Sequence, residues 1–335
     1  FITIIFYFQL FYCLNFYDIL LCNNLYWRII VESTFSFKSS TGFDVFAKKW
    51  INNDFKEHKG IIQLVHGMQE HIGRYNDFAN FLANNGYIVV GHDHLGHGNT
   101  AKCEDDFGYF ADNNGWDRLV EDVHILQNKV HNEYPNLPYI VMGHSMGSLI
   151  VRTYITKYDD NLTGVIISGT SGQKYGLISG KLLIKIISTF KGKMYKSKLI
   201  EHLVTGSFNK KFEPNRTPSD WICSDENEVN KFIEDEKCGK MFSVQAYYDL
   251  LSGTQYLSKQ KNVNKTVKVP ILIFSGDEDP VGQNGKGVLR VYKMLKKDGT
   301  RNVYLRLFKN ARHELLNEVN KLEVYNFILD WLDKL

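Results

Sequence analysis

The sequence predicts an α/β fold, in which helices cover both faces of a mostly parallel β-sheet. Short apolar, β-prone runs alternate with amphipathic stretches of helical spacing along most of the chain. One strand-to-helix junction, within residues 139–150, carries a Gly-x-Ser-x-Gly motif. The alternation is interrupted at residues 170–265, which are typical of helices and loops. Strands that alternate with helices indicate a parallel sheet, and the interruption indicates a mainly helical cap inserted between core strands.

Composition indicates an ordinary globular protein. The 335 residues suffice for one large domain with an insertion, and 44% hydrophobic and 23% charged residues are typical of globular proteins. The net charge is only +3, and no run of Lys/Arg with interleaved aromatics forms a recognisable RNA or DNA motif, so we expect no nucleic-acid partner. The five cysteines are scattered and odd in number, without a Cys-x-x-Cys pair. They predict reduced thiols in a cytoplasmic protein.

The first 31 residues are unusually apolar and aromatic. They have about the length of a membrane anchor. A secretory signal is a second interpretation, although a basic start and a small-residue cleavage site are missing. We favour a third, an over-extended reading frame, because the chain does not begin with Met and its Phe, Ile, Tyr and Asn residues are encoded by AT-rich codons. We assign this segment no function.

The predicted core comprises residues 32–169 and 266–335. Its first two strands alternate like an antiparallel pair joined by a Ser-Ser-Thr-Gly turn. The later strands are short apolar runs, and the helices have one apolar face and stop at glycine or before a strand. The predicted strands are 33–38, 44–50, 60–65, 87–90, 139–142, 165–168, 271–274 and 303–308, and the main helices are 75–85, 116–134, 286–296 and 318–335.

The predicted cap, residues 170–265, contains a basic stretch. Residues 174–198 carry seven lysines and no acids, interleaved with apolar side chains. A basic amphipathic helix can lie on a lipid surface, which makes Lys181 and Lys185 candidates for peripheral membrane contact. The alternative is a cap helix whose apolar face packs on the domain while its lysines face water.

Ser145 is the candidate nucleophile. It lies in Gly143-His-Ser-Met-Gly147, between the apolar run 139–142 and a stretch of helical spacing. A sharp strand-to-helix turn holds such a serine in a strained backbone above the sheet, and the two glycines remove the Cβ atoms that would crowd it. The alternative is a glycine-rich turn with a surface serine.

A serine hydroxyl needs a base and a group that orients the base. In this arrangement the order along the chain is serine, acid, histidine. Asp277, Glu278 and Asp279 follow the strand at 271–274, and we choose Asp279 because the proline after it stiffens the turn. His313 follows the last strand, and we predict that it is the general base. The alternative for His313 is a solvated loop histidine, and the alternative for residues 277–279 is an acidic surface turn.

The developing oxyanion also needs N–H donors. The residue after the nucleophile supplies one, so we assign Met146 N–H. A second should come from the loop after an early strand, where Met68 follows Gly67. We therefore predict Met68 and Met146 N–H as the oxyanion hole.

Six of the eleven histidines lie between residues 58 and 97, including His92-Asp-His94. The spacing matches no known zinc motif, so we predict hydrogen bonds that brace loops, and no metal. Gly285-Lys-Gly287 is not a phosphate-binding loop, because glycine stands where Ser or Thr is needed. We expect no cofactor.

Together these motifs resemble the monoacylglycerol lipase/lysophospholipase group of α/β-hydrolases, over about residues 33–335. The resemblance implies an α/β-hydrolase fold, a triad of Ser145, Asp279 and His313, oxyanion donors at Met68 and Met146, a cap that admits an acyl chain, and no metal or organic cofactor. It rests on His66-Gly-Met-Gln-Glu-His71 with Arg74-Tyr75, Asp93-His-Leu-Gly-His-Gly98, Gly143-His-Ser-Met-Gly147, Gly276-Asp-Glu-Asp-Pro280 and His313-Glu314.

We therefore predict a serine carboxylic-ester hydrolase acting on single-chain lipids, such as monoacylglycerol or lysophospholipid, through an acyl-enzyme. A serine rather than an aspartate nucleophile argues against an epoxide hydrolase or dehalogenase. An acyltransferase or peptidase of the same fold is an alternative, because the cap decides the substrate. A catalytically silent lipid-binding module is an alternative of another class. We expect a cytoplasmic protein that can associate with membranes.

Overall fold

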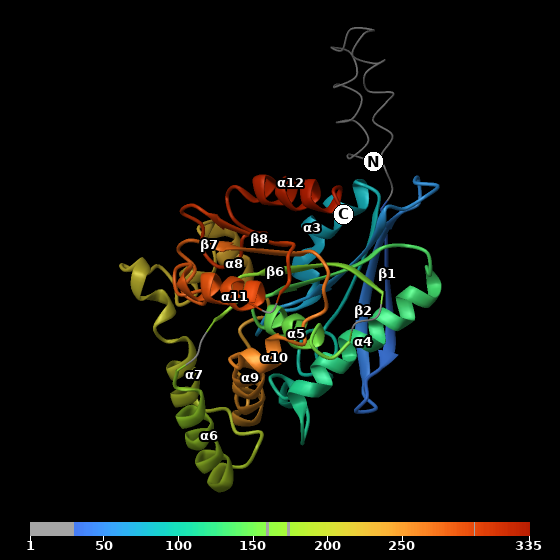
Figure 1. Ribbon diagram of the computed structural model, residues 1–335. Helices are drawn as coiled ribbons and strands as arrows, with labels where there is room; N and C mark the ends of the chain where they lie inside the picture. The colour runs from blue at the N-terminus through green and yellow to red at the C-terminus, as the bar shows by residue number, and fades with distance from the viewer. Residues whose placement is uncertain (1–29, 159–160, 173–174, 298) are drawn as a thin grey trace, which may run out of the picture.

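An eight-stranded sheet forms the centre of the molecule, with strand order β1-β2-β4-β3-β5-β6-β7-β8 (Figure 1). The computed structural model describes residues 30–158, 161–172, 175–297 and 299–335. The strands are β1 (Ile30–Lys38), β2 (Asp44–Asn52), β3 (Gly60–Val65), β4 (Tyr87–His92), β5 (Tyr139–His144), β6 (Leu162–Ser168), β7 (Ile271–Gly276) and β8 (Val303–Phe308).

The sheet is parallel from β4 to β8, and β1 and β2 add an antiparallel pair at one edge. Each of the strands from β3 to β7 is almost wholly buried, as expected for a parallel sheet covered on both faces. The register pairs Val65 with Gly143, and His144 with Ser168. The carboxyl ends of β3, β5 and β6 therefore meet at one edge, where loops of parallel sheets carry functional sites.

Helices cover both faces of the sheet, which confirms the predicted α/β class. On one face, α3 (Asn76–Asn84) and α12 (Lys321–Leu332) share an apolar core with the strands, and Figure 1 shows these two helices side by side. On the other face, α4 (Gly115–Glu133), α5 (Met146–Tyr154) and α11 (Lys286–Lys297) pack into a second core.

The segment between β6 and β7 is helical and, in its described part, contributes no strand to the sheet. Helix α9 packs against α4 and α5, and α6 packs against α9. Figure 1 shows α6 and α7 at the opposite end of the molecule from α12. The elements of this segment are α6 (Leu177–Lys191), α7 (Lys198–Thr205), η3 (Phe208–Phe212), η4 (Asp220–Ile222), α8 (Glu226–Glu234), α9 (Val244–Leu257) and α10 (Gln260–Val263).

Helix α6 has two apolar faces. Ile184 is buried, and Leu183 and Ile187 pack against the core. Four large apolar side chains on the same helix are exposed instead: Ile178 is 74% exposed, Leu182 60%, Ile186 49% and Phe190 80%. The packing of α6 therefore leaves an unusually apolar surface in contact with water.

Several predicted boundaries shift. Strand β1 begins at Ile30, two residues before the predicted start of the core at 32. Helix α12 is shorter than the predicted helix 318–335, because the Glu318 carboxylate accepts hydrogen bonds from backbone N–H groups of Ser224 and Arg312 and belongs to the preceding loop. The unusual segment 1–31 lies almost entirely outside the described residues. In the described part of the chain, no helix combines the length and apolarity needed to cross a bilayer.

Candidate active site

Ser145 sits at a tight turn between β5 and α5. Its backbone has φ +53° and ψ −120°, a conformation that is strained for a residue with a side chain. The flanking glycines allow this turn: a Cβ on Gly143 would lie 2.4 Å from the carbonyl oxygen of Gly147, and a Cβ on Gly147 would lie 2.0 Å from that of Val65. The serine N–H donates to the Ser168 carbonyl at 3.0 Å. These contacts give the predicted strand-to-helix turn its shape.

His313 and Asp279 contact each other below the surface. The Nδ1 atom of His313 lies 3.0 Å from Oδ1 of Asp279, and both side chains are buried. The carboxylate is held by two further donors, the Ser275 hydroxyl at 2.9 Å and the Val281 N–H at 2.9 Å. A carboxylate fixed in this way can set both the orientation and the tautomer of the imidazole.

The pair also changes the protonation behaviour of both groups. Burial acts to lower the pKa of His313, but the charge of Asp279 and the hydrogen bond to it outweigh burial and raise this pKa. Burial acts to raise the pKa of Asp279, but His313, Ser275 and the Val281 N–H lower it. An ionised carboxylate beside a more basic imidazole is suited to proton transfer.

The two other acidic candidates lie elsewhere. Asp277 accepts a hydrogen bond from Asn310 N–H at 2.8 Å, in the turn after β8. Glu278 forms a surface ion pair with Lys211 at 3.1 Å. Of the three neighbouring acids, only Asp279 is fully buried and contacts His313.

Four of the five predicted site residues line one cavity of about 840 Å³: Met68, Ser145, Met146 and His313. Asp279 lies behind His313. The Met68 loop closely approaches the serine, because a Cβ on Gly67 would lie 3.1 Å from Cβ of Ser145.

The two N–H groups predicted as oxyanion donors belong to Met68, in the loop after β3, and to Met146, at the start of α5. In the described part of the chain, no protein acceptor takes a hydrogen bond from Met68 N–H. Met146 is the first residue of α5, and N–H groups in the first turn of a helix have no acceptor within the helix. Both groups are therefore available to a bound oxyanion.

The helical segment between β6 and β7 supplies part of the cavity wall. Leu203, Phe208, Trp221 and Leu250 contribute apolar walls. The ring of Trp221 lies 5.2 Å from that of His313, centre to centre. The sequence analysis did not single out Trp221. It lies in the segment between β6 and β7, far along the chain from His313, and no local pattern indicates that the two rings meet. The cavity is large enough and apolar enough for an acyl chain.

A buried charge cluster below the site was also missed. Arg74 donates from Nη1 and Nη2 to both carboxylate oxygens of Glu314, at 2.6 and 2.7 Å, and from Nη1 to Glu70 at 2.9 Å. Glu70 in turn accepts from Gly67 N–H at 2.6 Å. The cluster thus joins the Met68 loop to the residue after His313. The sequence signals were the i, i+4 spacing of Glu70 and Arg74 and the presence of Glu70, Arg74 and Glu314 in the motifs that carry the family resemblance.

The histidine-rich loops are held together by hydrogen bonds. His94 N–H donates to Nε2 of His66 at 3.0 Å, and the two rings lie 4.0 Å apart. His97 Nδ1 lies 3.0 Å from the Leu95 carbonyl oxygen. Burial lowers the pKa of His97 to about 4, so this imidazole is neutral at physiological pH.

Among the described residues, one group could in principle hold a metal. The ligand atoms of His71, Asp235 and Cys238 all lie within 4.8 Å of one another. However, His71 Nε2 already contacts Asp235 at 2.8 Å, and burial raises the pKa of the Cys238 thiol. A protonated thiol is a poor metal ligand, so the hydrogen bond accounts for the group.

Comparison with known proteins places this geometry in a family. The family model described as "Serine aminopeptidase, S33" matches residues 56–320. The chain is 25% identical over 274 residues to a monoacylglycerol lipase of Mycolicibacterium smegmatis, covering 82% of this chain and 88% of that protein. It is 25% identical over 277 residues to a monoglyceride lipase of Rattus norvegicus, covering 81% and 80%.

A solved structure has the same fold as this chain. A thermostable carboxyl esterase from Bacillus coagulans, in complex with glycerol, superposes with a TM-score of 0.85 at 29% identity, covering 91% of this chain and 99% of that chain. These matches confirm the predicted α/β-hydrolase fold and the resemblance to monoacylglycerol lipases.

Proposed function

The chain belongs to the serine aminopeptidase S33 family of α/β-hydrolases, and on that premise we propose that it is a serine carboxylic-ester hydrolase acting on single-chain lipids. The observation that carries the proposal is the buried contact of His313 with Asp279, at the wall of the cavity that Ser145 lines. Relatives named monoacylglycerol lipase and a neighbour named carboxyl esterase support an ester substrate.

The reaction proceeds through an acyl-enzyme. Ser145 Oγ attacks the ester carbonyl carbon while His313 accepts its proton, and Asp279 stabilises the imidazolium. Met68 and Met146 N–H donate to the oxyanion. The intermediate collapses as His313 protonates the leaving alcohol. Water then gives its proton to His313, attacks the acyl carbon and releases the fatty acid, and the proton returns to the serine.

The cavity supports a lipid substrate. Its volume of about 840 Å³ and its walls of Leu203, Phe208 and Leu250 suit one acyl chain. We propose monoacylglycerol and lysophospholipid as substrates. Each step of the proposed reaction uses side chains and N–H groups of the chain itself, and we expect neither metal nor cofactor to take part.

The test is covalent labelling combined with a substrate panel. A fluorophosphonate is expected to add one adduct at Ser145 as fluoride leaves, and no adduct in Ser145→Ala, by intact mass and peptide mapping. Monoacylglycerols, lysophospholipids, short esters and aminoacyl anilides are then compared, with Ser145→Ala as the blank. Faster anilide cleavage would favour a peptidase, and acyl transfer to added alcohol in place of hydrolysis would favour an acyltransferase. Lipid binding without a fluorophosphonate adduct at Ser145 would favour a catalytically silent lipid-binding module.

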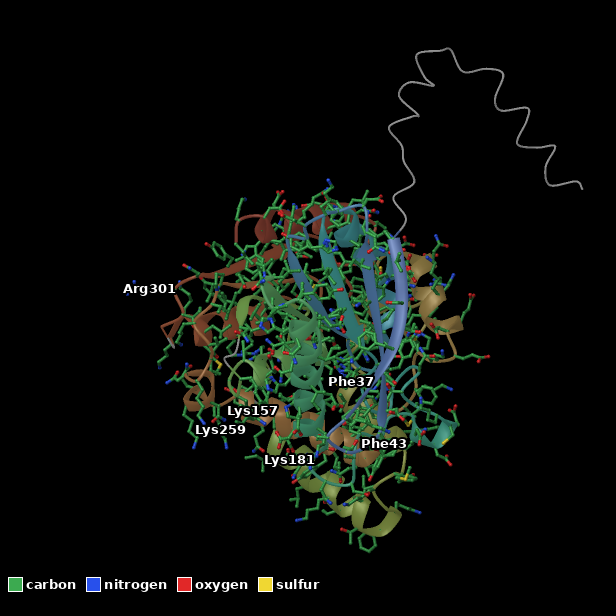
Figure 2. All side chains as sticks on the ribbon, turned by 90° about the vertical axis from the view of Figure 1, so that its right-hand side faces the viewer. Phe37, Phe43, Lys157, Lys181, Lys259 and Arg301 are labelled. Atoms are coloured by element: carbon green, nitrogen blue, oxygen red, sulfur yellow. The ribbon has the colours of Figure 1, made fainter. Side chains whose placement is uncertain are left out.

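We also propose that α6 and α7 dock on anionic membrane, with the cytoplasm as the site of action. Exposed apolar side chains on both helices lie beside exposed lysines. Of the two lysines named from the sequence, Lys185 is exposed, whereas Lys181 donates to Gln255 at 3.1 Å and lies over the ring of Tyr248 (Figure 2 labels Lys181). Apolar insertion with basic anchoring is typical of interfacial helices, and Leu203 of α7 also lines the cavity.

Co-sedimentation with vesicles tests this docking. The full chain is expected to bind phosphatidylserine-containing vesicles better than pure phosphatidylcholine. Because each basic residue near an anionic surface contributes about 1 kcal/mol, Lys185→Gln with Lys191→Gln should weaken binding roughly 30-fold. Phe190→Ser should weaken binding to both lipids. The matched controls lie on the surface of α11: Lys286→Gln with Lys293→Gln for the lysine pair, and Leu289→Ser for Phe190→Ser. Equal effects of the two double variants would contradict docking through α6.

A further inference from the structure

A smaller cavity of about 280 Å³ adjoins the catalytic pocket. It lies between α5, the loop after β6, the end of α9, α10 and α11. Leu149, Ser171 and Thr254 line both cavities, so the two spaces share a wall. The second cavity is therefore directly adjacent to the pocket that Ser145 lines.

The smaller cavity is cationic. Arg152, Arg290 and Lys297 line it, and none of the described residues around it is acidic. Three positive charges around a confined space attract an anion, and two guanidinium groups offer the planar donor pairs that match phosphate oxygens.

Arg152 is the most unusual of the three. Its side chain is buried, with 5% of the residue exposed, and it donates to the Thr170 hydroxyl at 3.2 Å and to the Ser171 carbonyl at 2.8 Å. Across the described residues, no carboxylate forms an ion pair with it. The buried Arg74, by contrast, contacts two carboxylates. A buried charge without a counterion is costly, and burial lowers the pKa of Arg152 to about 10. Within the described residues, a hydroxyl and a backbone carbonyl therefore hold the Arg152 guanidinium, and no counterion does.

Arg290 faces the same space from α11. Its Nε donates to the Gly172 carbonyl at 3.0 Å, which ties the side chain to the loop that also anchors Arg152. Ser171, Thr254 and Ser258 also line the cavity, where the hydroxyl groups of Thr254 and Ser258 donate to the carbonyl oxygens of Leu250 and Gln255. Backbone carbonyls, the Thr170 hydroxyl and the Gln283 amide oxygen therefore hold the two arginines, and no carboxylate among the described residues pairs with either.

We infer that this cavity binds the phosphate group of a single-chain phospholipid whose ester lies at Ser145. The inference rests on the proposed function and selects lysophospholipid among its substrates. Arg152 is seven residues after Ser145, about 10 Å along α5. The glycerol carbons of a lysophospholipid, together with the length of an arginine side chain, span a separation of this size. A monoacylglycerol has no charged group to place there.

The test compares octanoyl lysophosphatidic acid with octanoyl monoacylglycerol, both kept below their aggregation thresholds. Arg152→Met is expected to lower kcat/KM for the phosphate ester about ten- to a hundred-fold, mainly through KM, because a hydrogen-bonded ion pair is lost. Hydrolysis of monoacylglycerol should change less than twofold. Arg290→Met, at a less buried site, provides the same comparison should Arg152→Met fail to fold. Lys293→Met, an exposed lysine of α11 outside the cavity, is the control.

Inorganic phosphate distinguishes a head-group site from a site for a free anion. It should compete with the phosphate ester and leave monoacylglycerol hydrolysis unchanged. Equal inhibition of both substrates would assign the cavity to a free anion and overturn a substrate subsite. Equal loss for both substrates in the arginine variants, or no loss for either, would also overturn it.

A binding measurement separates this inference from the proposed catalysis. Calorimetry on Ser145→Ala should show that lysophosphatidic acid binds more tightly than monoacylglycerol, and that the preference is lost in Ser145→Ala with Arg152→Met. If no ester is hydrolysed and fluorophosphonate gives no adduct, the catalytic proposal fails, and this measurement still decides the anion site. If esters are hydrolysed and the preference is absent, only the anion site fails.

Discussion

Replacing Asp279 with asparagine is expected to lower kcat for ester hydrolysis by about 10⁴-fold. Asp279 accepts the contact from His313 Nδ1 at 3.0 Å, and its own position is fixed by Ser275 and the Val281 N–H. An asparagine amide can keep the size of the side chain, but its NH₂ group favours the wrong imidazole tautomer. The general base then no longer presents a lone pair to Ser145, although the oxyanion donors and the pocket remain.

The pH profile gives this prediction a second readout. His313 must be neutral to accept the serine proton, so kcat/KM falls as pH decreases through its pKa. Burial lowers this pKa, but Asp279 raises it above the ordinary value of 6.5, so the acid limb should lie above that value. In Asp279→Asn the limb should move to lower pH. A soluble short-chain ester, assayed from pH 5 to 9, measures both effects.

Asp277→Asn is the matched control for Asp279→Asn. It makes the same chemical change two residues away, in the turn where Asp277 contacts Asn310 N–H, and should leave kcat and the acid limb nearly unchanged. If Asp277→Asn lost as much activity as Asp279→Asn, the orienting carboxylate would have been assigned to the wrong residue.

The core could be predicted because its signals are local. The apolar run 139–142, the glycines around Ser145 and the helical spacing after them each record a constraint imposed by neighbouring residues. The steric contact of Gly147 with Val65 shows why no other residue type fits there. Asp279 and His313 could also be predicted, because each follows a late strand and parallel strands bring their carboxyl ends to one edge of the sheet.

The cap could not be predicted in the same way, because its side chains depend on distant partners. By its charge pattern alone, the acidic stretch 220–236 predicts a solvated face. Asp220 instead is buried and accepts from the backbone N–H groups of Arg216 and Thr217, and Asp235 contacts His71 of the core. The spacing of apolar residues shows which side of a helix is apolar, but it does not show which element of the fold packs on that side. The exposed apolar face of α6 is the clearest instance.

The buried cluster around Arg74 carries the largest expected effect on stability. Arg74→Met is expected to reduce the free energy of unfolding by about 3–5 kcal/mol at neutral pH, because removing one partner leaves buried carboxylates unpaired. Glu70 and Glu314 are both nearly inaccessible, and both contact the guanidinium. Urea unfolding, followed by tryptophan fluorescence, measures the loss. Arg118→Met removes a surface arginine paired with Glu121 and should cost at most about 1 kcal/mol.

The pH dependence of that loss distinguishes unpaired charge from lost packing. In the unaltered chain, Arg74 outweighs burial and lowers the pKa of Glu314 to about 2, so the stabilisation is present above the ordinary carboxyl pKa and is lost only as pH falls toward 2. Without Arg74, burial raises the carboxyl pKa values above their unfolded-state values, so protonation favours the folded form. The difference between Arg74→Met and the unaltered chain should therefore shrink from pH 7 to pH 4.5. A difference that stays constant over this range would indicate a packing defect. Because Glu70 also holds Gly67 N–H, the same variant should slow turnover at neutral pH even where it is folded.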